Sequence, residues 1–121
     1  MRQALAGFCV LWISCAAPAG AAELRWTRDF VLGLELILID HGRIENFTFD
    51  SKRFVTATVG TKEALTGPIW EWRIRGNKLQ IIDVSKLWDE WTLLRRDEHT
   101  ITVRRTGGTV DRFTYSRARK T

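Results

Sequence analysis

A β-hairpin predicted over residues 70–83 constrains the fold of this chain more than any other stretch. Its sequence, WEWRIRGNKLQIID, alternates apolar and polar side chains, which is the period of a strand with one buried face. Gly76-Asn77 suits a two-residue type II′ turn, in which the first central residue takes a positive φ. Counting outward from that turn gives the facing pairs Ile74–Leu79, Arg73–Gln80 and Trp72–Ile81.

Residues 1–22 have the three-part layout of a secretory signal peptide. A short basic start precedes an apolar run of eleven residues, Ala4 to Ser14, and small residues that include Pro18 follow it. The run is shorter than the roughly 20 apolar residues of a membrane-spanning helix. We therefore expect cleavage after Ala21 or Ala22 and one mature domain over residues 23–121, located in a bacterial periplasm or secreted.

Both cysteines of the chain, Cys9 and Cys15, lie in this leader. The mature domain would then contain neither a disulfide nor a cysteine metal site. A disulfide-free exported domain favours a bacterial cell envelope, because small secreted eukaryotic domains usually need bridges. In an alternative interpretation, Trp12-Ile13-Ser14-Cys15 is a lipoprotein cleavage box, and a lipid on Cys15 anchors the chain to a membrane.

The mature sequence is typical of an all-β domain with short strands, tight turns and no crossover helix. Residues 62–68 are expected to form a loop, and residues 84–90 a connection with one helical turn. The predicted strands cover residues 30–40, 43–49, 53–61, 70–75, 78–83, 91–95, 99–105 and 110–117. An antiparallel meander of eight strands removes its free edges by closing into a barrel. An outer-membrane barrel is the alternative, but the water-facing side carries charges that lipid would penalise.

The last three predicted strands separate their side chains cleanly by face. With three-residue loops the apolar face pairs Leu93 with Ile101, Trp91 with Val103, Val103 with Phe113 and Ile101 with Tyr115. Threonine and arginine side chains occupy the other face, so one face is core and the other is in water. In this register Arg104 faces Arg112, and Arg105 faces Asp111 and can pair with it.

In strand number and meander order, residues 31–117 resemble the small eight-stranded barrels of the lipocalin and avidin-like (calycin) group. The resemblance implies an exported, non-enzymatic barrel that carries a small apolar ligand and needs no cofactor. The lipocalin signature has Gly-x-Trp on the first strand, whereas Gly33 is followed here by Leu34 and Glu35. No ligand residue is therefore transferred from that group.

Inward-facing aromatic residues are the candidate ligand-binding residues: Trp70, Trp72, Trp91, Phe113 and Tyr115. In an eight-stranded barrel, inward side chains either fill the middle or line a cavity for one small ligand. Aromatic walls suit apolar or planar molecules. An empty lumen would favour a ligand carrier. A filled lumen would favour a protein-interaction module, such as an envelope inhibitor, immunity protein or accessory subunit.

Positive charge is concentrated at the carboxyl-terminal end of the chain. From Arg95 onward there are eight Lys or Arg against three acids, a net charge of +5, whereas residues 23–94 carry a net charge of −1. Arg104, Arg112 and Arg117 are the candidate contacts to an anionic partner, such as an acidic protein, lipopolysaccharide or membrane headgroups. An ordinary solvated basic tail is the simpler interpretation, and nucleic acid is not an expected partner of an exported chain.

The sequence offers little for catalysis. His41 and His99 are the only histidines, and both lie at predicted turns. There is no Gly-x-Ser-x-Gly, phosphate-binding glycine loop or metalloprotease His-Glu pair. Asp89 and Glu90 are adjacent, so on a strand they point to opposite faces. We therefore expect neither an enzyme nor a metal site, and an enzyme remains only a remote alternative.

Overall fold

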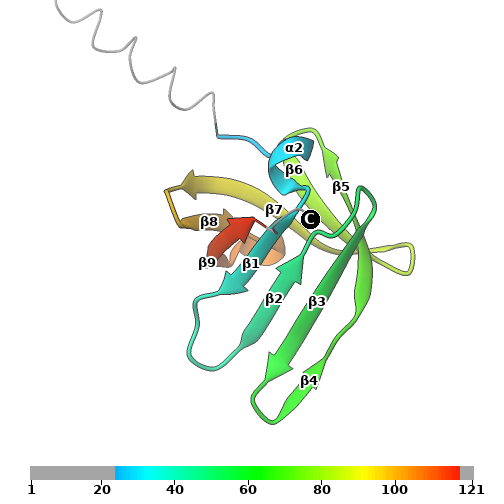
Figure 1. Ribbon diagram of the computed structural model, residues 1–121, viewed down its shortest axis with the longest axis vertical. Coiled ribbons are helices and arrows are strands. Elements are labelled where there is room, and N and C mark those ends of the chain that lie inside the picture. Colours follow the sequence, from blue (N-terminus) through cyan, green and yellow to red (C-terminus); the bar gives the residue numbers. More distant parts are fainter. Residues whose placement is uncertain (1–23, 118–121) are drawn as a thin grey trace, which may run out of the picture.

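Residues 24–117, the part of the chain that the computed structural model describes, contain nine strands that follow one another around a closed sheet (Figure 1). A short helix, α2 (Arg28–Val31), precedes them, and a 3-10 turn, η1 (Thr106–Gly108), separates the last two. The strands are β1 Leu34–Leu38, β2 Ile44–Thr48, β3 Phe54–Thr61, β4 Ala64–Thr66, β5 Ile69–Arg75, β6 Lys78–Asp83, β7 Lys86–Arg96, β8 Thr100–Arg104 and β9 Val110–Arg117.

Eight of these strands form the barrel that the sequence predicts. Each pairs antiparallel with its neighbours, and β9 returns to pair with β1, which closes the sheet. The ninth strand, β4, pairs with the second half of β3, whereas the first half of β3 pairs with β5. The prediction that residues 62–68 form only a loop is wrong at Ala64–Thr66, because three residues there extend the ladder beside β3.

The hairpin of β5 and β6 confirms the predicted turn and register. Ile74 pairs with Leu79, and Trp72 pairs with Ile81. Gly76 has a φ of +60°, whereas Asn77 does not have a positive φ, as a type II′ turn requires. Trp72 is buried, so the alternation that predicted a half-buried strand is present in the fold.

Two predicted elements around the barrel are wrong. Residues 30–40 do not form a single strand, because Thr27 caps α2 by accepting a hydrogen bond from the Phe30 N–H (3.2 Å). Gly33, with a φ of +85°, then turns the chain into β1. Residues 84–90 are not a helical connection either, because β7 begins at Lys86 after a two-residue turn.

A bulge in β7 explains why the apolar residues near 84–90 have a spacing that suggests a helical turn. The register of β7 with β6 shifts between Ile81 and Ile82, which leaves Trp88 as an extra residue on β7. A second shift opposite β8 leaves Leu94 unpaired. A β-bulge of this kind interrupts the alternation of faces, so apolar residues no longer recur at every second position.

The pairing of β8 with β9 keeps the predicted faces but not the predicted partners. Ile101 pairs with Phe113 and Val103 with Asp111, two residues away from the expected register. The loop between the strands is centred on Gly107, within η1, and not on Gly108 as the prediction assumed. A shift of two preserves which side chains point inward, so the core assignment is unaffected.

The predicted signal peptide, including Cys9 and Cys15, lies outside the described residues. No helix in the described part of the chain has the length and apolar character for a membrane crossing.

Gly60 marks a close contact between β3 and β4, and replacing it tests this part of the fold. A Cβ atom at this position would lie 2.0 Å from the Ala64 carbonyl oxygen, and the φ of Gly60 is +141°. We expect Gly60→Ala to lower the free energy of unfolding by at least about 1 kcal/mol, as measured by urea denaturation.

Gly42→Ala is the matched control, because the atom nearest to its added Cβ, Asp40 Oδ1, would be 3.9 Å away and its φ is not positive. This change should alter the free energy of unfolding by about 0.5 kcal/mol or less. Equal effects of the two substitutions would show that the β3–β4 contact is absent.

Candidate functional site

Four of the five predicted ligand-binding residues lie in the packed middle of the barrel. The side chains of Trp91 and Phe113 are fully buried, and their rings stack with centroids 5.1 Å apart. Phe47 meets Trp91 edge to face at 5.2 Å. These contacts are those of a filled aromatic core, in which rings pack against rings.

Trp70 and Trp72 are also buried against other aromatic side chains. Trp70 lies 4.2 Å from Trp88 between ring centroids, and Trp72 meets Phe49 edge to face at 5.6 Å. The indole N–H of Trp72 donates a hydrogen bond to the Ser51 carbonyl (2.9 Å). Trp72 is thus part of the packing under the β2–β3 connection.

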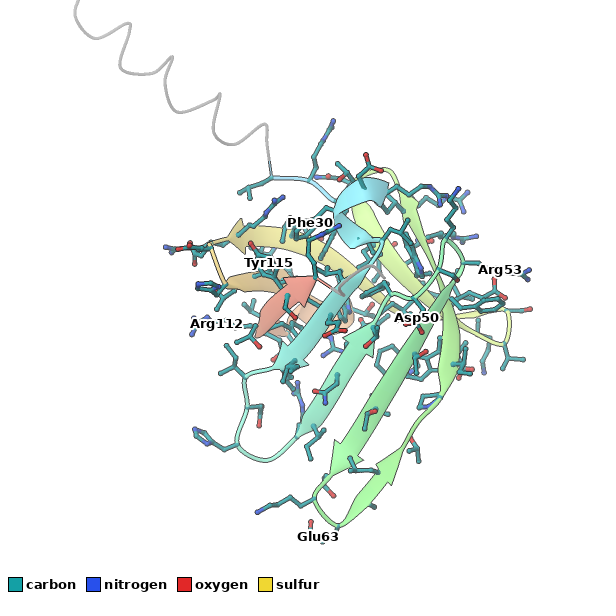
Figure 2. The ribbon with its side chains drawn as sticks, viewed as in Figure 1. Phe30, Asp50, Arg53, Glu63, Arg112 and Tyr115 are labelled. Carbon is teal, nitrogen blue, oxygen red and sulfur yellow. The ribbon has the colours of Figure 1, made fainter. Side chains whose placement is uncertain are left out.

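Tyr115, the fifth predicted residue, lies at the end of the barrel that α2 covers. It is half-buried and meets Phe30 of α2 edge to face at 5.6 Å, and Figure 2 shows the two side chains together at this end. The Tyr115 hydroxyl donates to the Asp97 carbonyl (2.7 Å). Tyr115 is therefore separated from the four core aromatic residues with which the sequence grouped it.

An open hollow of about 500 Å³ lies at this end of the barrel, which we call the α2 hollow. Arg96 covers the ring of Phe30, with its guanidinium carbon 4.0 Å from the ring centre. Among residues 24–117 the Arg96 guanidinium has no hydrogen-bond or ion-pair partner. The hollow is lined by Thr27, Asp29, Phe30, Arg96, Tyr115 and Arg117.

Arg117 does not lie with the other two residues predicted for an anionic partner. Its guanidinium donates to the carbonyls of Asp29 (2.7 Å), Phe30 (2.7 Å) and Leu32 (3.0 Å). These carbonyls belong to α2 and the residue that follows it, so Arg117 fastens the last strand to the helix that covers the barrel.

Arg104 and Arg112 lie on the outer face of neighbouring strands and are exposed. They do not face each other, because Arg104 pairs with Val110 and Arg112 with Thr102. They are diagonal neighbours instead, and neither has an ion-pair partner in the described part of the chain. Figure 2 shows Arg112 pointing away from the barrel.

Apolar side chains flank these two arginines. Val110, opposite Arg104, is 51% exposed, and Ile39, opposite Arg112, is 46% exposed. Ile37 of β1 is 54% exposed and pairs with Thr114 of β9. The outer face of β1, β8 and β9 thus presents cationic, apolar and hydroxyl side chains, together with one acidic side chain, Glu35, which pairs with Ser116; we call it the β8–β9 face.

The end of the barrel opposite α2 is closed by a buried ion network around Arg105. The predicted pair with Asp111 is present, with Nη1 3.1 Å from Oδ2. Asp89 Oδ2 lies 2.5 Å from Nη2, and Glu45 Oε1 lies 2.8 Å from Nη1. Arg43 adds a second cation, 2.9 Å from Asp111. Three carboxylates therefore face the buried guanidinium of Arg105 and the exposed guanidinium of Arg43 at this end of the barrel.

The surroundings of Arg105 stabilise its charged form. Burial alone would lower the pKa of the guanidinium, but attraction to Asp89 and Glu45 outweighs it, so the pKa is raised. The guanidinium carbon also lies 5.1 Å from the ring centre of Trp91 and 5.6 Å from that of Trp88. Asp89 is fixed in turn by the backbone N–H groups of Glu90 (2.9 Å) and Thr106 (3.1 Å).

This network was only partly accessible to sequence reasoning. Glu45 shares the inward face of β2 with Phe47 and Phe49, and a charge at an inward position requires a partner. Asp89 lies in the stretch that the sequence assigns to a connection, so its inward position could not be anticipated. Among residues 24–117 no group of three His, Cys, Asp or Glu side chains is arranged to hold a metal ion.

Comparison of the chain with protein-family models, curated proteins and solved structures finds no match.

Removing the central cation of the network should destabilise the barrel. We expect Arg105→Met to lower the free energy of unfolding by about 3–5 kcal/mol, because three carboxylates would remain at the barrel end with only Arg43 as a cation. Arg95→Met is the control, since Arg95 makes an exposed pair with Asp97 (3.3 Å) and its loss should cost about 1 kcal/mol or less. Urea denaturation of both variants measures the difference, and equal losses would contradict the network.

The turn between β1 and β2 gives a prediction about pH. Asp40 Oδ1 accepts hydrogen bonds from the backbone N–H groups of Gly42 (2.7 Å) and Arg43 (3.1 Å), which lower the pKa of Asp40 below its usual 3.8. A lowered pKa in the folded state stabilises the turn above pH 3.8, and this contribution is lost as the pH falls through the folded pKa. Carboxyl carbon NMR should therefore give Asp40 a midpoint below 3.8. A midpoint at or above that value would contradict the two bonds.

Proposed function

We infer that this protein is an exported, non-enzymatic, calycin-like barrel that binds peripherally to an anionic membrane surface of the cell envelope. The observation that carries this function is the composition of the β8–β9 face. Arg104 and Arg112 are exposed and make no ion pair within residues 24–117, and exposed Ile37, Ile39 and Val110 lie beside them.

This combination suits the interface between headgroups and acyl chains. Guanidinium groups bind lipid phosphates by charge-assisted hydrogen bonds, while neighbouring apolar side chains enter the boundary between headgroups and hydrocarbon. The outward acidic residue of β1, Glu35, pairs with Ser116, four residues along β9 from Arg112. The outward positions of β8 and β9 themselves carry no acidic residue. They are Thr100, Thr102, Arg104, Val110, Arg112, Thr114 and Ser116.

The packed aromatic core argues against carriage of an apolar ligand in the lumen and for binding through the outer surface. Trp91 and Phe113 each contact other rings, so their surfaces are used in the fold. By contrast, the exposed guanidinium groups of Arg104 and Arg112 make no ion pair within residues 24–117, so they are available to bind a partner. A membrane-binding role also agrees with the export that residues 1–22 predict.

Binding to vesicles tests the proposal directly. Each arginine near an anionic surface contributes about 1 kcal/mol, so Arg104→Gln with Arg112→Gln should weaken binding to phosphatidylglycerol vesicles roughly 30-fold. Cosedimentation measures the binding, and added salt should weaken it in the unmodified protein. Phosphatidylcholine vesicles should bind weakly.

Lys52→Gln with Lys62→Gln is the matched control, because it removes the same charge from two exposed loop positions away from the β8–β9 face. This variant should retain nearly all of its vesicle binding. The proposal fails if the unmodified protein does not bind anionic vesicles, which would favour a protein partner, or if both double variants weaken binding equally.

A further inference from the structure

The α2 hollow is separate from the β8–β9 face, and its chemistry is different. Arg95 and Arg96 are neighbours at the end of β7, yet they lie on opposite sides of the sheet. Arg95 pairs with Thr102, which is outward, whereas Arg96 pairs with Ile101, whose side chain is fully buried. Arg96 therefore reaches over the end of the barrel and into the hollow.

The contact with the Phe30 ring holds the Arg96 guanidinium in place without engaging its N–H groups in hydrogen bonds. The Arg96 guanidinium carbon lies 4.0 Å from the ring centre of Phe30, an attraction that uses none of its N–H groups, and these make no hydrogen bond within residues 24–117. Such a group can form two parallel hydrogen bonds with a carboxylate. Arg117 adds a second positive charge beside it, although its own donors are engaged with the backbone carbonyls around α2.

The remaining lining restricts the ligand further. Asp29 is an acceptor, so a ligand that meets both Arg96 and Asp29 must carry hydrogen-bond donors as well as an anionic group. Phe30 is only 8% exposed, which leaves little apolar surface for an alkyl chain. A hollow of about 500 Å³ is within the usual size of small-molecule sites and exceeds the volume of one six-membered ring with its substituents.

We propose that the α2 hollow binds a small hydroxylated carboxylate of single-ring size, the chemical class of the uronic acids. The carboxylate pairs with the in-plane N–H groups of Arg96, and ring hydroxyl groups donate to Asp29. The half-buried ring of Tyr115 forms the aromatic edge against which the ligand ring rests. This site does not depend on membrane binding, so each proposal can fail without the other.

NMR titration of the isotopically labelled full chain tests the site with three probes. Glucuronate should give saturable shifts at Phe30, Arg96 and Tyr115, with a Kd of about 1 mM for a contact this small and open. Glucose lacks the carboxylate and cyclohexanecarboxylate lacks the hydroxyl groups. Each should bind at least roughly tenfold more weakly, because each leaves one side of the hollow unpaired.

Two neighbouring substitutions provide a matched pair. Arg96→Gln should weaken glucuronate binding at least roughly tenfold, because it removes the charge-assisted pair, whereas Arg95→Gln should leave binding unchanged. Arg96→Lys keeps the charge but cannot pair with two oxygens in one plane, so it should give an intermediate Kd and serves if Arg96→Gln disturbs the fold. The Arg104→Gln and Arg112→Gln variant should bind glucuronate normally.

Three results would overturn the site. The first is an absence of saturable shifts with glucuronate at tens of millimolar, well above the expected Kd of about 1 mM. The second is equal weakening by Arg95→Gln and Arg96→Gln, which would indicate a general charge effect. The third is binding of cyclohexanecarboxylate as tight as that of glucuronate, which would remove the role of Asp29.

Discussion

The pairing of β1 with β9 is the constraint on which the rest of the structure depends, because it joins the two ends of the meander. Leu34 pairs with Arg117 and Leu38 with Phe113, across about 80 residues of sequence. Once eight strands are closed in this way, the interior holds either side chains or one small ligand, and here buried side chains fill it. Every inward residue must then be apolar, as Leu36 is, or must find a partner inside.

The two ends of the barrel satisfy this requirement by different chemistry. At one end α2 covers the core, Trp26 donates its indole N–H to the Trp91 carbonyl (3.0 Å), and Arg117 binds the carbonyls around the helix. At the other end Arg105 neutralises inward carboxylates that would be too costly to bury alone. The functional surfaces we propose use residues that these two closures leave free, namely Arg96 at the α2 end and Arg104 and Arg112 outside.

Local patterns predicted most of the strands, but not β4, the start of β7 or the contacts between strand ends. The β5–β6 hairpin could be predicted residue by residue, because Gly76 fixes the turn and the turn fixes the register. Between β8 and β9 the loop is centred on Gly107, within η1, and neither Gly107 nor its neighbour Gly108 shows from composition alone which of them is the centre, so the partner of Phe113 could not be predicted. The bulge at Trp88 concealed the start of β7 for a similar reason, since an extra residue breaks the alternation. The α2 hollow depends on a contact between Phe30 and Arg96, which are 66 residues apart in the sequence. A local sequence pattern cannot predict such a contact.

Backbone NOEs between β1 and β9 would test closure of the barrel most directly. In the closed barrel we expect contacts between Leu36 and Tyr115 and between Leu38 and Phe113, together with slow amide exchange along both strands. An open sheet would lack these contacts and would leave the amides of β1 or β9 unprotected on one edge. That result would contradict the closed barrel, and with it the positions of Arg96, Arg104 and Arg112 on which both proposed surfaces rest.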